Sequence, residues 1–148
     1  MDTWKEFDAN ELTHSASHHL HAIHEVGRRY GGWARVSDIA RELNITRGSV
    51  SINLRALKKR GLVMQDEHHM VKLSPVGEQI VGAVAAKRVA LKALLHEVLR
   101  IDEAQAEIDS CKIEHLVSDA TREHLAAFLK FWRSSSMGKK FQPEAGEK

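Results

Sequence analysis

A chain of 148 residues can fold around one compact core, or form a small domain joined to a dimerisation element. Its 22 Lys and Arg residues almost balance its 20 Asp and Glu residues, so net charge alone indicates no nucleic-acid partner. No apolar run approaches the length of a membrane span and no secretory leader opens the sequence, so we expect a cytoplasmic protein without membrane contact. The single cysteine excludes an internal disulfide and leaves packing, metal binding or redox chemistry as its role.

Charge is distributed unevenly along the chain. Residues 28–72 contain ten Lys or Arg and four Asp or Glu, whereas residues 101–130 contain three basic and seven acidic residues. A basic first half and an acidic second half indicate two tasks on one chain.

The first half of the chain has the pattern of three helices and a hairpin. The predicted elements are helices at about 10–30, 35–44 and 45–57, followed by strands at 62–65 and 70–73. Gly31 and Gly32 end the first helix, and Thr46 is a suitable N-cap for the third. This order predicts a winged helix-turn-helix DNA-binding domain over residues 1–74.

The second half is predicted to be helical, which makes the whole protein mainly α. The expected helices span about 75–100, 102–115 and 118–132. Residues 75–135 form a helical dimerisation and metal-binding domain in this interpretation, and residues 136–148 form a polar tail expected to be disordered. The apolar faces of the first and last of these helices predict either a dimer surface or an intramolecular core; on the last, the residues are Leu125, Phe128, Leu129 and Trp132.

The polar residues of the third helix are the candidates for DNA contact. In a helix-turn-helix the second helix of the motif enters the major groove by its N-terminal residues. Arg47 has the chemistry for a bidentate contact to guanine, and serine hydroxyls can donate to phosphate. The predicted DNA-binding residues are Arg35, Thr46, Arg47, Ser49, Ser51, Asn53, Lys58 and Lys59. Winged helices that bind only other proteins remain an alternative.

The segment Cys111-Lys112-Ile113-Glu114-His115 contains the only cysteine. In a helix, positions i, i+3 and i+4 lie on one face, so Cys111, Glu114 and His115 would project together. Sulfur, oxygen and imidazole ligands suit a divalent transition metal better than magnesium or calcium. The alternative is a cysteine that packs as a small hydrophobe beside a solvated helix edge.

The predicted first helix is rich in histidine. Five of the ten histidines lie within residues 14–24, and His14, His18 and His21 share one helical stripe that Glu25 continues. This stripe lies inside the domain, which indicates native sequence and a possible second source of metal ligands.

Several segments resemble the DtxR/MntR family of metal-dependent transcriptional regulators. The resemblance covers about residues 12–135 and rests on Ala34–Leu43, Gly48–Ser51, Gly61–Val63, Leu73–Gly77 and above all Cys111–Asp119. It implies a homodimer in which bound metal orders the first helix and positions two winged helices on a palindromic DNA operator. It also implies a repressor of metal-uptake genes, with metal as co-repressor.

The resemblance also implies a set of metal ligands. The main site of the family falls on Cys111, Glu114 and His115, with first-helix ligands at His18 and His21. Because the family usually has a methionine or acidic residues on that helix, two histidines would favour Fe2+, Zn2+ or Co2+ over Mn2+, and we expect Fe2+. His14, His24 and Glu25 are further candidates. An ancillary metal site found in some members is not expected, because its positions are Arg88, Lys92 and Glu107. The chain ends soon after Trp132, so no SH3-like third domain is expected.

Two other classes of function compete with this interpretation. Cys111 beside His115 and Lys112 is a candidate redox switch in a winged-helix regulator, although no second cysteine is present to resolve it. A small metalloenzyme is the other alternative, but His24-Glu25 and His96-Glu97 lack the second histidine of a zinc-protease helix. We therefore predict that the protein is not an enzyme.

Overall fold

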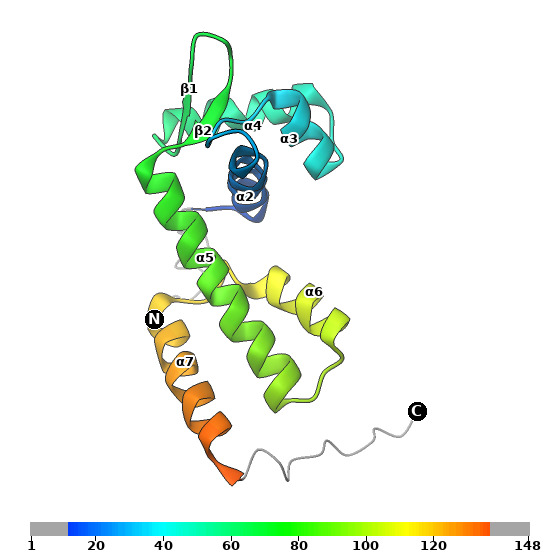
Figure 1. The fold of residues 1–148 in the computed structure, drawn as a ribbon, viewed down its shortest axis with the longest axis vertical. Coiled ribbons are helices and arrows are strands. Elements are labelled where there is room, and N and C mark those ends of the chain that lie inside the picture. Colours follow the sequence, from blue (N-terminus) through cyan, green and yellow to red (C-terminus); the bar gives the residue numbers. More distant parts are fainter. Residues whose placement is uncertain (1–11, 137–148) are drawn as a thin grey trace, which may run out of the picture. The chain divides into compact units, whose positions relative to one another are not determined.

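The structure is a computed structural model that describes residues 12–136 and divides into two compact units, residues 1–82 and 83–148. Within residues 12–136, no helix is long and apolar enough to cross a membrane. The division falls inside helix α5 (Pro75–Ala93), whereas the sequence placed a domain boundary after residue 74 (Figure 1). The predicted tail lies outside the described residues except for Ser136.

The first unit contains three helices and a two-stranded wing. The helices are α2 (His14–Arg28), α3 (Val36–Leu43) and α4 (Arg47–Lys59), and the strands are β1 (Val63–Gln65) and β2 (Val71–Leu73). Thr13 and Thr46 begin α2 and α4, because each side-chain oxygen accepts a hydrogen bond from a backbone N–H of the first turn. Asn44 adopts a left-handed conformation that ends α3 and makes the turn into α4. The predicted winged helix-turn-helix is confirmed, although α2 is shorter than expected at both ends.

The wing is an antiparallel hairpin. Val63 pairs with Leu73 and Gln65 with Val71, while an isolated bridge joins Val71 to Ala34 just before α3. At the tip, the Asp66 carboxylate accepts backbone hydrogen bonds from His68 and Met70, which closes the turn. The hairpin is thereby attached to the helices at its base and exposed at its tip, where His68 and His69 lie.

A continuous apolar core holds the first unit together. Leu20 and Ile23 of α2, Ile39 of α3 and Val50 of α4 are fully buried, and Val71 of the wing joins them. Side chains spaced three and four residues apart on each helix supply this core, as the apolar periodicity predicts. The beginning of α5 belongs to the same core through Val81.

A glycine allows α5 to pack closely on the wing. A Cβ atom at Gly77 would collide with the backbone carbonyl oxygen of Leu62, so only glycine fits there. The Ser74 hydroxyl donates to the Gly61 carbonyl and accepts from the Gly77 N–H, which connects the end of the wing to the start of α5. These contacts explain why the first turns of α5 belong to the first unit.

The second unit is entirely helical within its described residues. After α5 come a π-helical segment, η1 (Leu94–Val98), then α6 (Glu103–Ile113) and α7 (Asp119–Ser134). The sequence predicted one regular helix to about residue 100. Instead, the wide turn of η1 and a left-handed Arg100 end it. The small core of this unit consists of Ala90, Val98 and Leu129, so Leu129 belongs to the intramolecular core.

Candidate DNA-binding surface and metal centre

The N-terminal turn of α4 carries most of the predicted DNA-binding residues. Arg47, Ser49 and Ser51 are exposed, and Asn53 is half-buried. Thr46 accepts the Ser49 N–H at 3.1 Å, so its hydroxyl caps the helix and is not simply a free contact group. The amino terminus of the helix, with its partial positive charge, thus faces solvent beside a guanidinium group, which is an arrangement that suits an anionic backbone.

Two of the candidate side chains bond to their own helix. The Ser51 hydroxyl donates to the Arg47 carbonyl at 2.9 Å, and the Asn53 amide donates to the Ser49 carbonyl at 3.0 Å. These bonds hold both side chains against the helix while leaving acceptor positions open. Arg47 is exposed at the first helical position, from which its long side chain can reach a partner.

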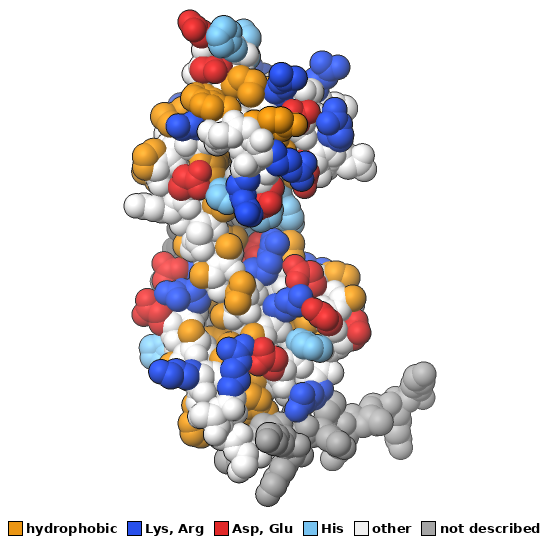
Figure 2. All heavy atoms as spheres, in the orientation of Figure 1, with side chains coloured by type: hydrophobic (Ala, Val, Ile, Leu, Met, Phe, Trp, Pro, Cys, Tyr) orange, Lys and Arg blue, Asp and Glu red, His pale blue; other side chains and the backbone are white. Residues whose placement is uncertain are grey.

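The remaining candidates surround the motif. Arg35 is exposed at the N-cap position of α3, and Lys59 is exposed at the end of α4. Lys58 donates to the Gln65 side chain at 2.9 Å, which connects the end of α4 to β1. On the face drawn in Figure 2, Lys and Arg side chains gather over the part of the first unit that contains α3 and α4.

Sequence analysis did not single out two residues of α4. Ile52 is 62% exposed and Arg55 is also exposed, and they lie one turn apart on the helix. An apolar side chain exposed on a recognition helix can contact a thymine methyl group, and arginine can contact phosphate or guanine. A visible signal was available, because Ile52 falls off the inward stripe of Val50, Leu54 and Leu57.

The second unit brings Cys111 and Glu114 to one cation, the guanidinium group of Arg88 on α5. Arg88 Nε donates to Glu114 Oε2 at 2.5 Å, and Arg88 Nη2 donates to Glu114 Oε1 at 2.8 Å. The same Nη2 lies 3.4 Å from Cys111 Sγ. One nitrogen therefore contacts two of the five side chains that the sequence predicted as metal ligands.

Burial strengthens this ion pair. The Glu114 side chain is 3% exposed and that of Arg88 is 25% exposed. The hydrogen bond from Glu114 raises the pKa of Arg88 above its ordinary value, against the opposing effect of burial. A carboxylate this deeply buried must be neutralised by a cation, and here the protein provides the cation itself.

The donor set fits a divalent transition metal. A thiol sulfur and a carboxylate converge on one position that already accommodates positive charge, and His115 follows directly in the chain. Thiolate, carboxylate and imidazole ligands occur together in iron, zinc or cobalt sites.

The other predicted ligands occupy different settings. Helix α6 ends at Ile113, so Glu114 is its C-cap and His115 lies in the following turn, whereas one continuous helix to 115 was predicted. His18 and His21 are half-buried on α2 in the first unit, and the buried histidine of that helix is His19. Within residues 12–136, no three His, Cys, Asp or Glu side chains gather as a metal-binding group. Ligation by His18 and His21 stays a prediction.

The lower-ranked ligand candidates have partners of their own. His24 Nδ1 lies 3.0 Å from a Glu78 carboxylate oxygen, and Glu25 lies 3.7 Å from Arg28. His14 and His18 are in edge-to-face contact, with ring centroids 4.3 Å apart.

The ancillary positions form ion pairs. Lys92 Nζ lies 3.1 Å from Glu103 and 3.0 Å from Glu107, and these hydrogen bonds raise the pKa of Lys92. Together with the Arg88 pair, these ion pairs join α5 to α6 and to its C-cap, Glu114.

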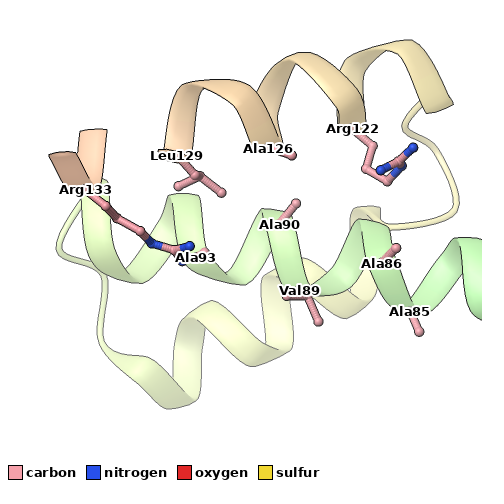
Figure 3. Close-up of a pocket in the computed structure, with 9 residues that line it drawn as sticks. All are labelled: Ala85, Ala86, Val89, Ala90, Ala93, Arg122, Ala126, Leu129 and Arg133. Atoms are coloured by element: carbon pink, nitrogen blue, oxygen red, sulfur yellow. The ribbon is translucent and has the colours of Figure 1, made fainter. Parts of the chain in front are cut away.

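A groove of about 400 Å³ lies between α5 and α7 (Figure 3). Alanines and one valine form its α5 wall, and Arg122 and Arg133 of α7 stand toward its two ends. Val89 in this wall is 70% exposed, while Phe128 and Phe131 expose further apolar surface on α7. Exposed apolar residues in such a concentration are typical of a surface that another protein covers.

The fold and these clusters define a winged helix-turn-helix regulator with a separate helical ligand-binding unit. Residues 74–142 match the family model of the iron dependent repressor, metal binding and dimerisation domain, and residues 11–69 match that of the MarR family. Together with the relatives described below, these matches support the DtxR/MntR family of metal-dependent transcriptional regulators. Members regulate transcription and are not enzymes, which confirms the rejection of a catalytic role.

Individual relatives agree with this assignment. The diphtheria toxin repressor of Corynebacterium diphtheriae is 24% identical over 86% of this chain and 56% of its own length. The HTH-type transcriptional regulator MntR of Lysinibacillus sphaericus is 31% identical over 59% of this chain and 62% of its own. The chain thus spans little more than half the length of these curated relatives. The structure of the manganese regulator SloR has a TM-score of 0.68 at 22% identity, covering 78% of this chain and 54% of that one, which shows a shared fold.

Proposed function

We propose that this protein is a metal-dependent repressor that binds DNA as a homodimer. One observation carries the proposal: Cys111 and Glu114 converge on a single cation position in a chain whose other unit is a winged helix-turn-helix. Membership of the family supports the same conclusion. A cytoplasmic location accords with a DNA target.

The DNA-binding role rests on α4 and its surroundings. Arg47 and the exposed first turn of α4 would contact base edges and phosphates in the major groove. Arg35, Lys58 and Lys59 would neutralise phosphates around it, and Arg55 is a further candidate. Two copies related by a two-fold axis would read a palindromic operator.

The groove between α5 and α7 is the proposed dimer surface. The matching family model describes a dimerisation domain over these residues. The groove is apolar along α5 and is bordered by the exposed Val89. Burial of this face against a second copy would stabilise the dimer through the hydrophobic effect.

Cys111, Glu114 and His115 are the proposed metal ligands of the second unit, and His18 and His21 those of the first. A metal bound by ligands from both units would favour one arrangement of α2 and α6 over others. Metal binding would thereby be coupled to the affinity for DNA. A divalent metal, when bound, supplies the positive centre that these ligands share. The thiol and the imidazolium groups must lose protons before they can bind metal. The affinity for metal should therefore decrease as the pH drops through the range in which histidine titrates.

Iron(II) is the proposed physiological metal, with genes of metal uptake as targets. The sulfur and imidazole donors support iron, zinc or cobalt over manganese. The description of the matching domain favours iron, although SloR is described as a manganese regulator.

Anaerobic titration tests the proposal. Metal-free protein would be titrated with iron(II), manganese(II), zinc(II) or cobalt(II), and binding to a labelled fragment of its own upstream region would be followed by fluorescence anisotropy. We expect one metal to strengthen DNA binding and Cys111→Ala to abolish that response. Equal binding with metal and with chelator would contradict the proposal and favour a redox role for Cys111.

A further inference from the structure

We infer that Arg88 is a built-in competitor of the metal, which holds Glu114 and Cys111 in the metal-free protein and sets the metal concentration needed for a response. This inference rests on the proposed function and adds a determinant of sensitivity to it. Its basis is that Arg88 Nη2 contacts Glu114 Oε1 at 2.8 Å and Cys111 Sγ at 3.4 Å. A cation shared by these two ligands would have to approach the position that Nη2 occupies.

The geometry of the ion pair makes competition unavoidable. Arg88 uses two nitrogens on the two oxygens of Glu114, so neither oxygen is free of the guanidinium group. Even if Arg88 stayed beside a bound metal, it would place a positive charge next to a divalent cation in a poorly solvated site. The affinity for metal is therefore lowered in both cases: by this repulsion if Arg88 stays, and by the loss of its ion pair with Glu114 if Arg88 is displaced.

Burial of Glu114 gives the competition its strength. The Glu114 carboxylate is 3% exposed and is therefore poorly solvated by water. It remains paired with Arg88 until another cation replaces the guanidinium group. The neighbouring lysines of α5 are paired elsewhere: Lys92 with Glu103 and Glu107, and Lys87 with Asp119. Within the described contacts, the effect on Glu114 therefore belongs to Arg88.

Cobalt(II) binding provides a direct readout, because a cysteine thiolate bound to cobalt gives a charge-transfer absorption band. Four full-length proteins would be compared: the unchanged chain, Arg88→Gln, Arg88→Lys and Lys87→Gln. Lys87→Gln is the matched control, since it removes the same charge from the adjacent residue of α5 and breaks a different ion pair, that of Lys87 with Asp119. Glutamine at position 88 removes the charge but keeps a donor for Glu114.

We expect Arg88→Gln to lower the half-saturating cobalt concentration by about tenfold or more, and Lys87→Gln to change it by less than about threefold. Arg88→Lys, which keeps the charge but loses the two-pronged geometry, should lie between. Thermal unfolding gives a second readout. Arg88→Gln should melt at a lower temperature than the unchanged chain without metal and gain more from added cobalt.

The outcomes separate this inference from the proposed function. If the unchanged chain binds cobalt but Arg88→Gln binds it no better, Arg88 is not a competitor and the inference fails, while the metal-sensor proposal stands. If Arg88→Gln binds cobalt through Cys111 and the unchanged chain does not, competition is supported and the sensor proposal fails. If none of the four proteins gives the thiolate band, both fail. Should Arg88→Gln not fold, the comparison of Arg88→Lys with Lys87→Gln decides in the same way.

Discussion

The two units of this protein are stabilised by different means. In the first, Leu20, Ile23 and Ile39 are completely buried in one core shared by helices and wing. In the second, the core is small, and ion pairs join its helices: Arg88 with Glu114, Lys87 with Asp119 and Arg133 with Glu97. The first unit buries a large apolar core of its own, whereas the second leaves apolar surface exposed and joins its helices by ion pairs. The second is therefore the unit suited to respond to a cation and to a second copy.

The largest effect should come from the core of the first unit. Ile23→Ala removes a fully buried side chain and should lower the free energy of unfolding by about 3 kcal/mol. Urea denaturation followed by circular dichroism measures this. Phe131→Ala in the second unit, where the side chain is 58% exposed, should cost less than about 1 kcal/mol. Equal losses would remove the contrast between the units.

Breaking the buried ion pair should come next. Glu114→Ala leaves the half-buried Arg88 without its carboxylate partner. Without metal, the free energy of unfolding should fall by about 2–3 kcal/mol, which is less than for fully buried pairs because Arg88 is 25% exposed. Unfolding in the presence of chelator measures the loss. The solvent-accessible pair of Lys112 with Asp109 is the control, and Asp109→Ala should destabilise the protein much less than Glu114→Ala does.

The dimer surface can be disrupted from the groove. Val89→Glu places a charge in the proposed interface and should weaken dimerisation by about thirtyfold or more, with little change in helix content. Analytical ultracentrifugation over a range of concentrations measures the dissociation constant. Ile108→Glu, an equally drastic change at an exposed position of α6 outside the groove, should leave the dimer intact. The opposite pattern would relocate the interface to α6.

A smaller effect is expected at the DNA surface. Arg47→Ala should weaken metal-dependent binding to the operator by about 1–3 kcal/mol and relax sequence preference at one position. Arg28→Ala removes the same charge from the end of α2 in the same unit and should change affinity far less. Fluorescence anisotropy at fixed salt concentration compares them. Equal losses would mean that Arg47 acts only through overall charge.

The weakest effect should be the pH dependence of the pair between η1 and α7. Arg133 lowers the pKa of Glu97 through two hydrogen bonds, so the folded pKa lies below the unfolded one. The pair therefore contributes fully to the stability of the fold above the usual Glu pKa of about 4.3. This contribution is lost as the pH falls through the lower pKa that Glu97 has in the folded protein. Because Glu97 is 39% exposed, Glu97→Gln should cost only about 0.5 kcal/mol at pH 7. Melting curves at pH 7 and pH 3 should show that difference disappear at low pH.

Sequence reasoning anticipated the local features well. The inward stripe of Val50, Leu54 and Leu57 and the cap at Thr46 are set by neighbours along the chain, and the structure has them as expected. The wing was also expected, because alternating side chains and a polar turn are short-range signals. The end of α6 was predicted two residues too late: the helix ends at Ile113, and its C-cap Glu114 is paired with Arg88 of α5, a contact that local sequence does not reveal.

The sequence by itself determined the secondary structure of the first unit, the residue types available for DNA and metal, and the family. Only the tertiary structure decided what those residues contact. Arg88 and Glu114 are 26 residues apart, so no periodicity could pair them, and their contact depends on how α5 packs against the end of α6. The assignment of Leu129 to the core and of Val89 to the surface has the same origin. Local sequence sets dihedral angles and faces, whereas burial and charge pairing arise only when distant segments are packed together.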